Sequence, residues 1–299
     1  MADLRGLANK RLVIFGCGYV GREIAHRAGA AGMRVEALTR NPDRASELSA
    51  AGVTVVVADL ASDGWHERIA PGADVVVNCV GSGGGSVEDY RRSYVEGMRS
   101  VLSWARRGSA GTIVYTSSTS VYPQGGGRLV DEEAATGGGG TSALLLEAEA
   151  LLADSGAGCR RWFILRLAGI YGPGRHHLLD QLRAGVPRLP GGGDHRLNLA
   201  HRDDICAAVF AVGAAPAALR NRIYNVADDA PAPRAEVVGW LAKELGCAPP
   251  GFEGGAASRR GGFTAPRDRI ISNRRLKLEL GWQPRYPSYR EGYAAILSA

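Results

Sequence analysis

The chain has 299 residues, of which 45% are hydrophobic and 22% are charged, and its formal net charge is +6. This size and composition fit one large α/β unit, or a main domain with a smaller one, and allow a full hydrophobic core. No apolar run reaches the roughly 18 residues of a membrane span, and the scattered arginine pairs lack a recognition motif, so neither a membrane nor a nucleic-acid partner is expected.

Short β-rich runs alternate with helix-like runs along the first half of the chain. Continuous apolar strands between helices are typical of a parallel sheet covered on both faces, and right-handed crossovers then produce a doubly wound, Rossmann-type α/β fold. The predicted strands are 11–15, 33–39, 53–57, 74–80, 112–117, 161–167 and 222–226. The predicted helices are 19–31, 42–51, 87–107, 142–154, 177–184, 203–214, 234–246 and 273–280.

The pattern loosens after residue 168, which suggests two parts of different function. We expect a dinucleotide-binding domain over 1–168, to which 200–228 returns, and a smaller, mostly substrate-binding part over 169–299. The five cysteines are widely spaced without a C-x-x-C pair, and the first strand starts too early to leave room for a signal peptide. Both features favour a cytoplasmic protein, expected as a monomer or homodimer.

A glycine-rich turn joins the first predicted strand to the first predicted helix. It reads Gly16-Cys17-Gly18-Tyr19-Val20-Gly21. Strand, glycine turn and helix form the context of a dinucleotide site, in which Gly16 makes the turn, Gly18 admits a diphosphate and Gly21 lets helix and strand pack closely. The N–H groups at the helix start, from Tyr19 and Val20 onward, would face the phosphates. The alternative is a tight turn without a ligand.

The end of the second strand distinguishes the two nicotinamide coenzymes. An acidic residue there would bind the ribose hydroxyls of NAD, whereas an arginine accommodates the 2′-phosphate of NADP. This chain has Thr39-Arg40 at that point, and its Glu36 sits mid-strand, poorly placed for the ribose. NADP is therefore the expected cofactor, with NAD as the alternative, unless Arg40 is only a solvated loop residue.

Further polar residues follow the third and fourth strands, at the edge where an open α/β sheet binds ligands. Asp59 could accept a hydrogen bond from an adenine amino group, with Leu60 beside it, although Asp is also a common helix cap. Asn78, Val80 and Gly81 end the fourth strand beside the expected cofactor cleft.

Several motifs resemble one known superfamily, in order and over nearly the whole chain. They are the glycine run and the segments 59–60, 116–122, 166–175, 198–204, 224–228 and 280–284. Together they resemble the extended short-chain dehydrogenases/reductases, the NAD-dependent epimerase/dehydratase group. The resemblance implies cofactor contacts at Ser117, Arg166 and Gly169, and a hydrogen bond from Ser118 to the reacting oxygen. These serines could instead only tie up loop backbone.

One family feature is missing. The family uses a Tyr-x-x-x-Lys pair on the next helix, where the ammonium favours the phenolate. Here Thr141 and Leu145 stand at those positions, and the chain's only lysines are Lys10, Lys243 and Lys277. In this respect the chain resembles the atypical bacterial YeeZ-type subgroup.

Other residues near the expected nicotinamide must then move the proton. Ser118, Tyr122 and His176 are the catalytic candidates, with His177 as the other possible histidine, because a histidine titrates near neutral pH. The alternative is that both histidines are only polar residues at a helix start. Arg175 with Arg259 or Arg260 could bind an anionic small-molecule substrate. No cluster has metal-ligand spacing, so no metal is expected.

Two functions fit these residues. The first is an atypical NADP-dependent oxidoreductase that acts on a small carbonyl or hydroxyl compound. The second is a non-catalytic NADP-binding redox sensor or interaction protein.

Overall fold

A computed structural model describes the chain except residues 1–3, 255–257, 260–261, 264–266 and 299. The chain divides into two compact units. Unit 1 comprises residues 1–121, 137–166 and 206–224, and unit 2 comprises 122–136, 167–205 and 225–299.

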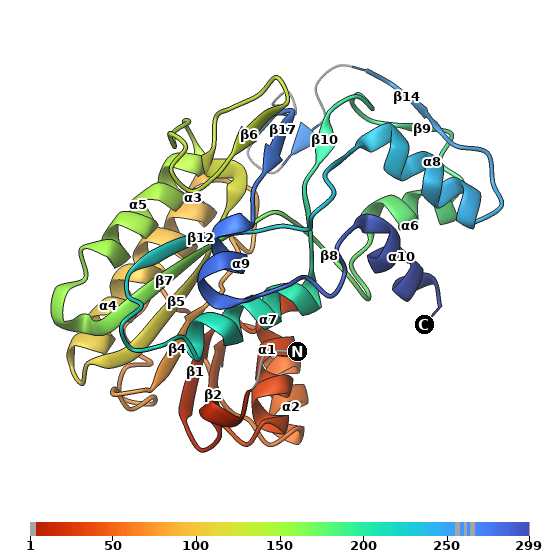
Figure 1. The fold of residues 1–299 in the computed structure, drawn as a ribbon. Helices are drawn as coiled ribbons and strands as arrows, with labels where there is room; N and C mark the ends of the chain where they lie inside the picture. The colour runs from red at the N-terminus through yellow and green to blue at the C-terminus, as the bar shows by residue number, and fades with distance from the viewer. Residues whose placement is uncertain (1–3, 255–257, 260–261, 264–266, 299) are drawn as a thin grey trace. The chain divides into compact units, whose positions relative to one another are not determined.

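A seven-stranded parallel sheet forms the centre of unit 1, in the order β12-β7-β5-β4-β1-β2-β3 (Figure 1). The strands are β1 (Arg11–Phe15), β2 (Arg34–Thr39), β3 (Thr54–Val57), β4 (Val75–Asn78), β5 (Ala110–Ser118), β7 (Cys159–Leu167) and β12 (Arg222–Val226). The chain crosses from β3 back past β1 to β4, so the strand order reverses between β1 and β4. That reversal is where open α/β sheets leave a crevice for a ligand.

Helices cover this sheet on both faces, as a parallel sheet requires. They are α1 (Tyr19–Ala30), α2 (Pro42–Ala50), α3 (Val87–Tyr90), α4 (Gly97–Arg106), α5 (Thr141–Ala153) and α7 (Arg202–Gly213), whose first residues belong to unit 2. A π-helical segment, η2 (Arg91–Glu96), joins α3 to α4, and short 3-10 turns occur at Leu4–Leu7, Thr119–Val121 and Gly156–Gly158. Figure 1 shows α4 and α5 on one face of the sheet and α1 and α2 on the other.

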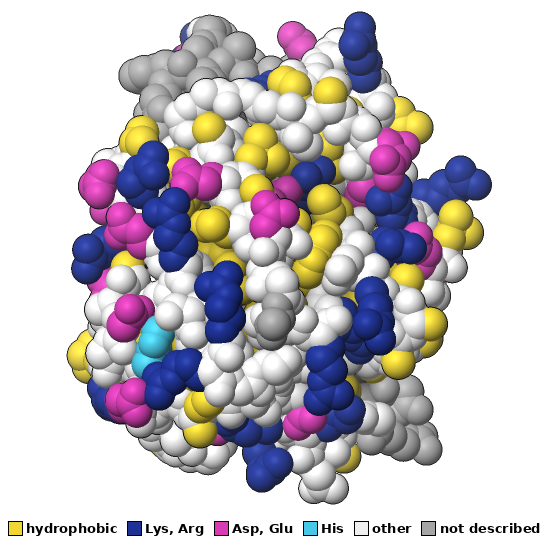
Figure 2. Space-filling model, turned by 90° about the vertical axis from the view of Figure 1, so that its left-hand side faces the viewer, with side chains coloured by type: hydrophobic (Ala, Val, Ile, Leu, Met, Phe, Trp, Pro, Cys, Tyr) yellow, Lys and Arg dark blue, Asp and Glu magenta, His cyan; other side chains and the backbone are white. Residues whose placement is uncertain are grey.

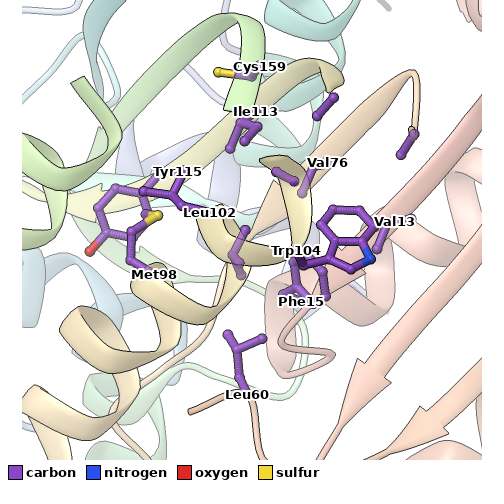
Figure 3. Close-up of a cluster of buried hydrophobic side chains, with 14 of the residues drawn as sticks. Val13, Phe15, Leu60, Val76, Met98, Leu102, Trp104, Ile113, Tyr115 and Cys159 are labelled. Atoms are coloured by element: carbon purple, nitrogen blue, oxygen red, sulfur yellow. The ribbon is translucent and has the colours of Figure 1, made fainter. Parts of the chain in front are cut away.

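The face under α4 and α5 carries a large aromatic core (Figure 3). Phe15 of β1 packs edge-on against Trp104 of α4, with ring centroids 5.4 Å apart, and Trp65 lies 4.8 Å from Phe15. Both tryptophans are fully buried, and their indole N–H groups donate to backbone carbonyls of Leu60 and Ile69. This core fixes the strands whose ends carry the glycine loop.

In the residues of unit 2 that the structure describes, small paired strands combine with four helices. The strand pairs are β6 (Arg128–Val130) with β17 (Arg269–Ile271), β8 (Gly169–Tyr171) with β11 (Leu199–His201), β9 (Arg188–Leu189) with β14 (Gly251–Phe252), β10 (Arg196–Leu197) with β13 (Ala232–Pro233), and β15 (Ser258–Arg259) with β16 (Gly262–Phe263). The helices are α6 (His177–Arg183), α8 (Arg234–Glu244), α9 (Arg274–Leu280) and α10 (Tyr289–Leu297). Leu179, Val237, Leu241 and Tyr293 lie in its core.

The predicted doubly wound fold is confirmed, and the predicted strands and helices lie close to the observed ones. Some details differ. The helix expected over 87–107 contains the π-helical segment η2, and the sequence does not predict the short strands of unit 2 or helix α10. Its start is marked by a capping box, in which Ser288 and Glu291 hydrogen-bond each other's backbone N–H groups, a signal legible in the sequence as Ser-x-x-Glu.

The described surface carries mixed charge. On the face shown in Figure 2, Arg and Lys side chains alternate with Asp and Glu, and hydrophobic surface lies between them. Exposed ion pairs such as Arg99–Glu147 and Arg107–Glu67 are part of this mixture. Within the described ranges, no helix is long and apolar enough to cross a bilayer.

Candidate functional site

The glycine loop turns so tightly that two of its glycines cannot carry a side chain. Gly16 has φ +94°, and a Cβ there would lie 2.6 Å from the Val80 backbone nitrogen and Cα. A Cβ on Gly21 would collide with the Gly16 carbonyl oxygen and lie 2.8 Å from Cys79 Sγ. The loop therefore packs directly on the segment after β4, as the sequence predicts for a turn between strand and helix.

Gly18 is different, because it faces open space. A Cβ on Gly18 would have no neighbour within 4 Å. Gly18 is the N-cap of α1 and has extended backbone, and no side chain caps the helix there. Tyr19 and Val20 form the first turn. The uncapped helix start and the space beside Gly18 fit a diphosphate, which would be bound by backbone N–H groups and the helix dipole.

Two arginines follow β2, and one of them contacts the glycine loop. Arg40 is exposed, and its Nη2 packs against Gly83 in the loop after β4. Arg44, in the first turn of α2, donates through Nη1 to the Cys17 carbonyl oxygen at 3.4 Å. Sequence reasoning singled out Arg40 and missed Arg44. The helix start at Asn41-Pro42 could have indicated Arg44, because it places residue 44 one turn from the strand end.

The neighbouring candidates at β2 have local partners. The buried Thr39 hydroxyl accepts from the Asn41 N–H at 3.2 Å, which shapes the turn before α2. Glu36 forms an ion pair with Arg11, whose Nε lies 2.6 Å from Glu36 Oε1. Glu36, the acidic residue of β2, is thus engaged with the neighbouring strand β1.

Asp59 is held by two partners after β3. Its Oδ1 accepts from the Ala61 N–H at 3.0 Å, and its Oδ2 accepts from Arg92 Nε and Nη2 at 3.0 and 2.8 Å. Burial alone would raise the pKa of this carboxyl, but these hydrogen bonds and the charges of Arg92 and Arg40 outweigh it and hold the pKa below its ordinary value. Asp59 is therefore an ionised carboxylate near Arg40.

Of the other predicted cofactor-binding residues that follow β3 or end β4, some lie in the core and some at the surface. Leu60 is buried in the core shown in Figure 3. Asn78 is fully buried, and its Nδ2 faces Met98 Sδ at 3.9 Å, so its side chain points into the core rather than toward the loop. Val80 is partly buried, and its backbone lies against Gly16. Gly81 is exposed.

Ser117 and Arg166 meet in a buried polar cluster instead of at the surface. Arg166 donates to Glu149 of α5 through Nε and Nη2, at 3.0 and 2.6 Å, and the Ser117 hydroxyl donates to Glu149 Oε1 at 2.6 Å. Arg166 and Glu149 side chains are 4% and 6% exposed. These side chains tie β5, β7 and α5 together, because a buried charge needs its partner. The cofactor contacts expected of Ser117 and Arg166 stay a prediction.

Ser118 is the last residue of β5 and follows Ser117, which makes the contact with Glu149. It is partly buried, and its Oγ accepts from the Ser120 N–H at 3.1 Å. A hydroxyl that accepts one hydrogen bond keeps its own O–H to donate. The first turn of α5 lies next to this segment, since Ser142 donates to the Ser120 carbonyl oxygen at 3.1 Å. On α5, Thr141 is partly buried and Leu145 is buried.

Unit 2 contains the other candidate residues, among them Tyr122, whose hydroxyl has a buried partner. Its side chain is fully buried, and its hydroxyl donates to Asn225 Oδ1 at 2.8 Å. Its carbonyl oxygen accepts from Arg267 and Arg269. Tyr122 thus has structural contacts through both its hydroxyl and its carbonyl oxygen. The catalytic role expected of Tyr122 stays a prediction.

His176 and Gly169 lie at the edges of unit 2 elements. His176 precedes α6, and its Nδ1 lies 2.7 Å from Asp180 Oδ1, with the imidazole 14% exposed. The exposed Gly169 starts β8, where a Cβ would lie 3.0 Å from the Asn198 carbonyl oxygen. Arg175 is exposed, whereas Arg260 and the Arg259 side chain lie outside the described residues. In the described part of the chain, no group of three or more His, Cys, Asp or Glu residues could hold a metal ion.

Three comparisons relate this geometry to known proteins. A model of the NAD dependent epimerase/dehydratase family matches residues 12–227. Protein YeeZ of Escherichia coli K12 is 27% identical over 284 residues, covering 93% of this chain and 97% of that protein. The 2-alkyl-3-oxoalkanoate reductase of Stenotrophomonas maltophilia is 27% identical over 253 residues, or 79% of this chain and 76% of the relative. The structure of MoeE5 in complex with UDP-glucose and NAD has a TM-score of 0.82 at 21% identity, covering 96% of this chain and 97% of that one.

The seven-stranded sheet and its strand–glycine loop–helix unit define a Rossmann-type α/β protein. Because the family model spans more than half of the sequence, the chain belongs to the NAD dependent epimerase/dehydratase family. The resemblance to the YeeZ-type subgroup is confirmed by the match over nearly the full length of YeeZ.

Proposed function

We propose that this chain is an NADP-dependent oxidoreductase that acts on a small carbonyl or hydroxyl substrate without a Tyr–Lys pair. The observation that carries the proposal is a pair of arginines that follow β2: Arg44 donates to the Cys17 carbonyl oxygen next to Gly18, and Arg40 lies against Gly83 in the loop after β4. A guanidinium pairs well with phosphate. Glu36, the acid nearest this point in β2, is engaged with Arg11.

A nicotinamide coenzyme, when bound, supplies or accepts the hydride. In this chain, Gly18 and the start of α1 would bind its diphosphate, and Arg40 and Arg44 its 2′-phosphate. Ser118 would donate its O–H to the reacting oxygen, since its Oγ already accepts from Ser120. A reductase relative and the NAD complex of a protein with the same fold support a nicotinamide coenzyme, and the preference for NADP rests on Arg40 and Arg44 alone.

The proposal includes proton relay by His176, which stands beside Asp180 and is partly exposed. A histidine with a carboxylate partner has the chemistry of a proton relay at neutral pH. It also includes a cytoplasmic location, for which free cysteines are typical, and all five cysteines are unbridged.

Coenzyme binding tests the first half of the proposal. Isothermal titration of the wild type with NADPH and with NADH should show tighter binding of NADPH. Arg40→Ala and Arg44→Ala should each weaken NADPH about tenfold and leave NADH unchanged, the size of one lost charge-assisted hydrogen bond. Arg27→Ala, which removes an arginine paired with Glu23 at the far end of α1, is the control. Equal affinity of the wild type for both coenzymes would refute the assignment of NADP.

Hydride transfer tests the second half. The wild type, Ser118→Ala and His176→Ala would be incubated with 4-deuterated NADPH and a library of small carbonyl compounds, and deuterated products would be sought by mass spectrometry. We expect transfer by the wild type and slower transfer by both variants.

The second candidate is a non-catalytic NADP-binding sensor, favoured by Thr141 and Leu145 at the positions of the family's Tyr and Lys. Tight NADPH binding without deuterium transfer to any compound would support the sensor.

A further inference from the structure

The region around Arg40 is not simply basic. Arg40 Nη2 packs against Gly83, and the Asp89 carboxylate packs against the next residue, Gly84. The Ser86 hydroxyl and N–H hold Asp89 at 2.6 and 3.1 Å. Hydrogen bonds from Ser86, together with the charge of Arg40, lower the pKa of Asp89, and Arg40 also contributes to the low pKa of Asp59. Two carboxylates therefore share the surroundings of Arg40, and like charges there oppose the binding of a phosphate.

Arg92 changes this balance through a single contact. It reaches Asp59 Oδ2 with both Nε and Nη2, at 3.0 and 2.8 Å, while Asp59 Oδ1 is fixed by the Ala61 N–H at 3.0 Å. The Arg92 and Asp59 side chains are 52% and 29% exposed, so solvent reaches the pair. With the Asp59 charge countered, the positive charges of Arg40 and Arg44 outweigh the remaining carboxylate of Asp89.

The backbone around Arg92 is unusual. Arg92 lies in η2, the π-helical segment between α3 and α4. π-helical turns are rare and occur frequently at functional sites. Glu88 and Glu96, one turn to either side, also act on Arg92 and raise its pKa after the larger effect of Asp59. The acidic neighbours make Arg92 the cation that offsets negative charge on this side of Asp59.

We propose that Arg92 is a coenzyme-specificity residue that acts through Asp59: by neutralising this carboxylate, it lets Arg40 and Arg44 accept a 2′-phosphate. The inference rests on the proposed function, because it concerns the preference for NADPH over NADH. In this inference Arg92 acts through its Nε and Nη2 contacts with Asp59 and not by contact with the phosphate. Removal of Arg92 should weaken NADPH selectively, and removal of Asp59 in addition should restore it.

The test is a double-mutant cycle that measures the ratio of the NADH to the NADPH dissociation constant at low ionic strength, where surface charges act most strongly. Arg92→Ala should lower this ratio about fivefold, the upper end of the effect of an exposed charge pair. Asp59→Asn with Arg92→Ala should return the ratio to that of the wild type. The ratio is the readout because any contact of Asp59 with the adenine affects both coenzymes equally.

Arg99→Ala is the matched control. Arg99 is an exposed arginine of the following helix whose partner is Glu147, at 2.8 Å. It should leave the ratio unchanged, and thermal melting would verify that every variant is folded.

Each outcome bears on the inference. If Arg92→Ala leaves the ratio unchanged while Arg40→Ala lowers it, the role of Arg92 is refuted and the proposed function stands. If the double variant stays as weak as Arg92→Ala, Arg92 contacts the phosphate directly and the route through Asp59 is refuted. A wild type without a preference for NADPH overturns the proposed cofactor and this inference together.

Discussion

Helix α5 carries two glutamates of similar chemistry in opposite environments, and they should differ greatly in their effect on stability. Glu147 pairs with Arg99 at 2.8 Å, with side chains 36% and 55% exposed. Glu149 pairs with Arg166 at 2.6 Å, with side chains 6% and 4% exposed, and also accepts from Ser117. Replacement by glutamine removes the charge in both cases and keeps the shape.

We expect Glu149→Gln to lower the free energy of unfolding by about 3–5 kcal/mol, because it leaves the Arg166 charge buried without its counterion. Glu147→Gln should cost less than about 1 kcal/mol, because water solvates Arg99 when its partner is removed. Urea unfolding followed by tryptophan fluorescence suits the comparison, since Trp65 and Trp104 are fully buried in the same unit.

The double variant Glu149→Leu with Arg166→Met separates burial of charge from general damage to the core. Because it removes both charges, it should be more stable than Glu149→Gln alone. Equal losses for Glu149→Gln and Glu147→Gln would refute the reasoning, as would a double variant less stable than the single one. Loss of the pair should also release Ser117, and with it the end of β5 that carries Ser118.

Gly18→Ala should leave the melting temperature unchanged but weaken NADPH binding in a titration, because the new methyl group meets no protein atom within 4 Å and occupies the space proposed for the diphosphate. Gly21→Ala should instead lower the melting temperature, since its Cβ would lie 2.8 Å from Cys79 Sγ. A lower melting temperature for Gly18→Ala together with an unchanged one for Gly21→Ala would contradict the geometry of the loop. Burial raises the pKa of Asp228 to about 8 in the folded protein, from its ordinary value of 3.8. Between these two pH values the folded protein holds a proton that the unfolded chain has released. The free energy of unfolding should therefore fall as the pH rises toward 8. Burial also raises the pKa of Asp204, to about 6, so Asp204 contributes with the same sign at lower pH. In urea unfolding, Asp228→Asn should therefore flatten the dependence of the free energy of unfolding on pH between about pH 6 and pH 8. An unchanged dependence in that range would exclude Asp228 as its source.

Local patterns predicted the central elements well. Strand β1 and strand β12 begin and end where the sequence predicts, and helix α6 differs only at its last residue. Apolar runs, helix starts and glycine turns depend on neighbours within a few residues, so they are legible without the fold. The short strands of unit 2 were missed because β6 and β17 are only three residues long and pair across a long stretch of sequence.

The candidate site was predictable in part for the same reason. The sequence places Gly16, Gly18 and Gly21 in a turn, and the structure adds the space beside Gly18. The sequence also shows that no lysine follows Lys10 before Lys243, which excludes the Tyr–Lys pair whatever the register of the helix. The motif position of Tyr122 predicts a catalytic residue, whereas only the packing shows that its hydroxyl donates to Asn225.

The sequence by itself therefore determined the order of strands and helices, the glycine turn and the absence of the Tyr–Lys pair, because each depends on residue types at short spacing. Tertiary structure alone decided the partners of the charges. Arg92 lies on Asp59, Arg11 on Glu36 and Arg166 on Glu149, across separations of 33, 25 and 17 residues. The physical reason is that the effect of a charge depends on its distance from other charges and from water, which the folding of the chain sets.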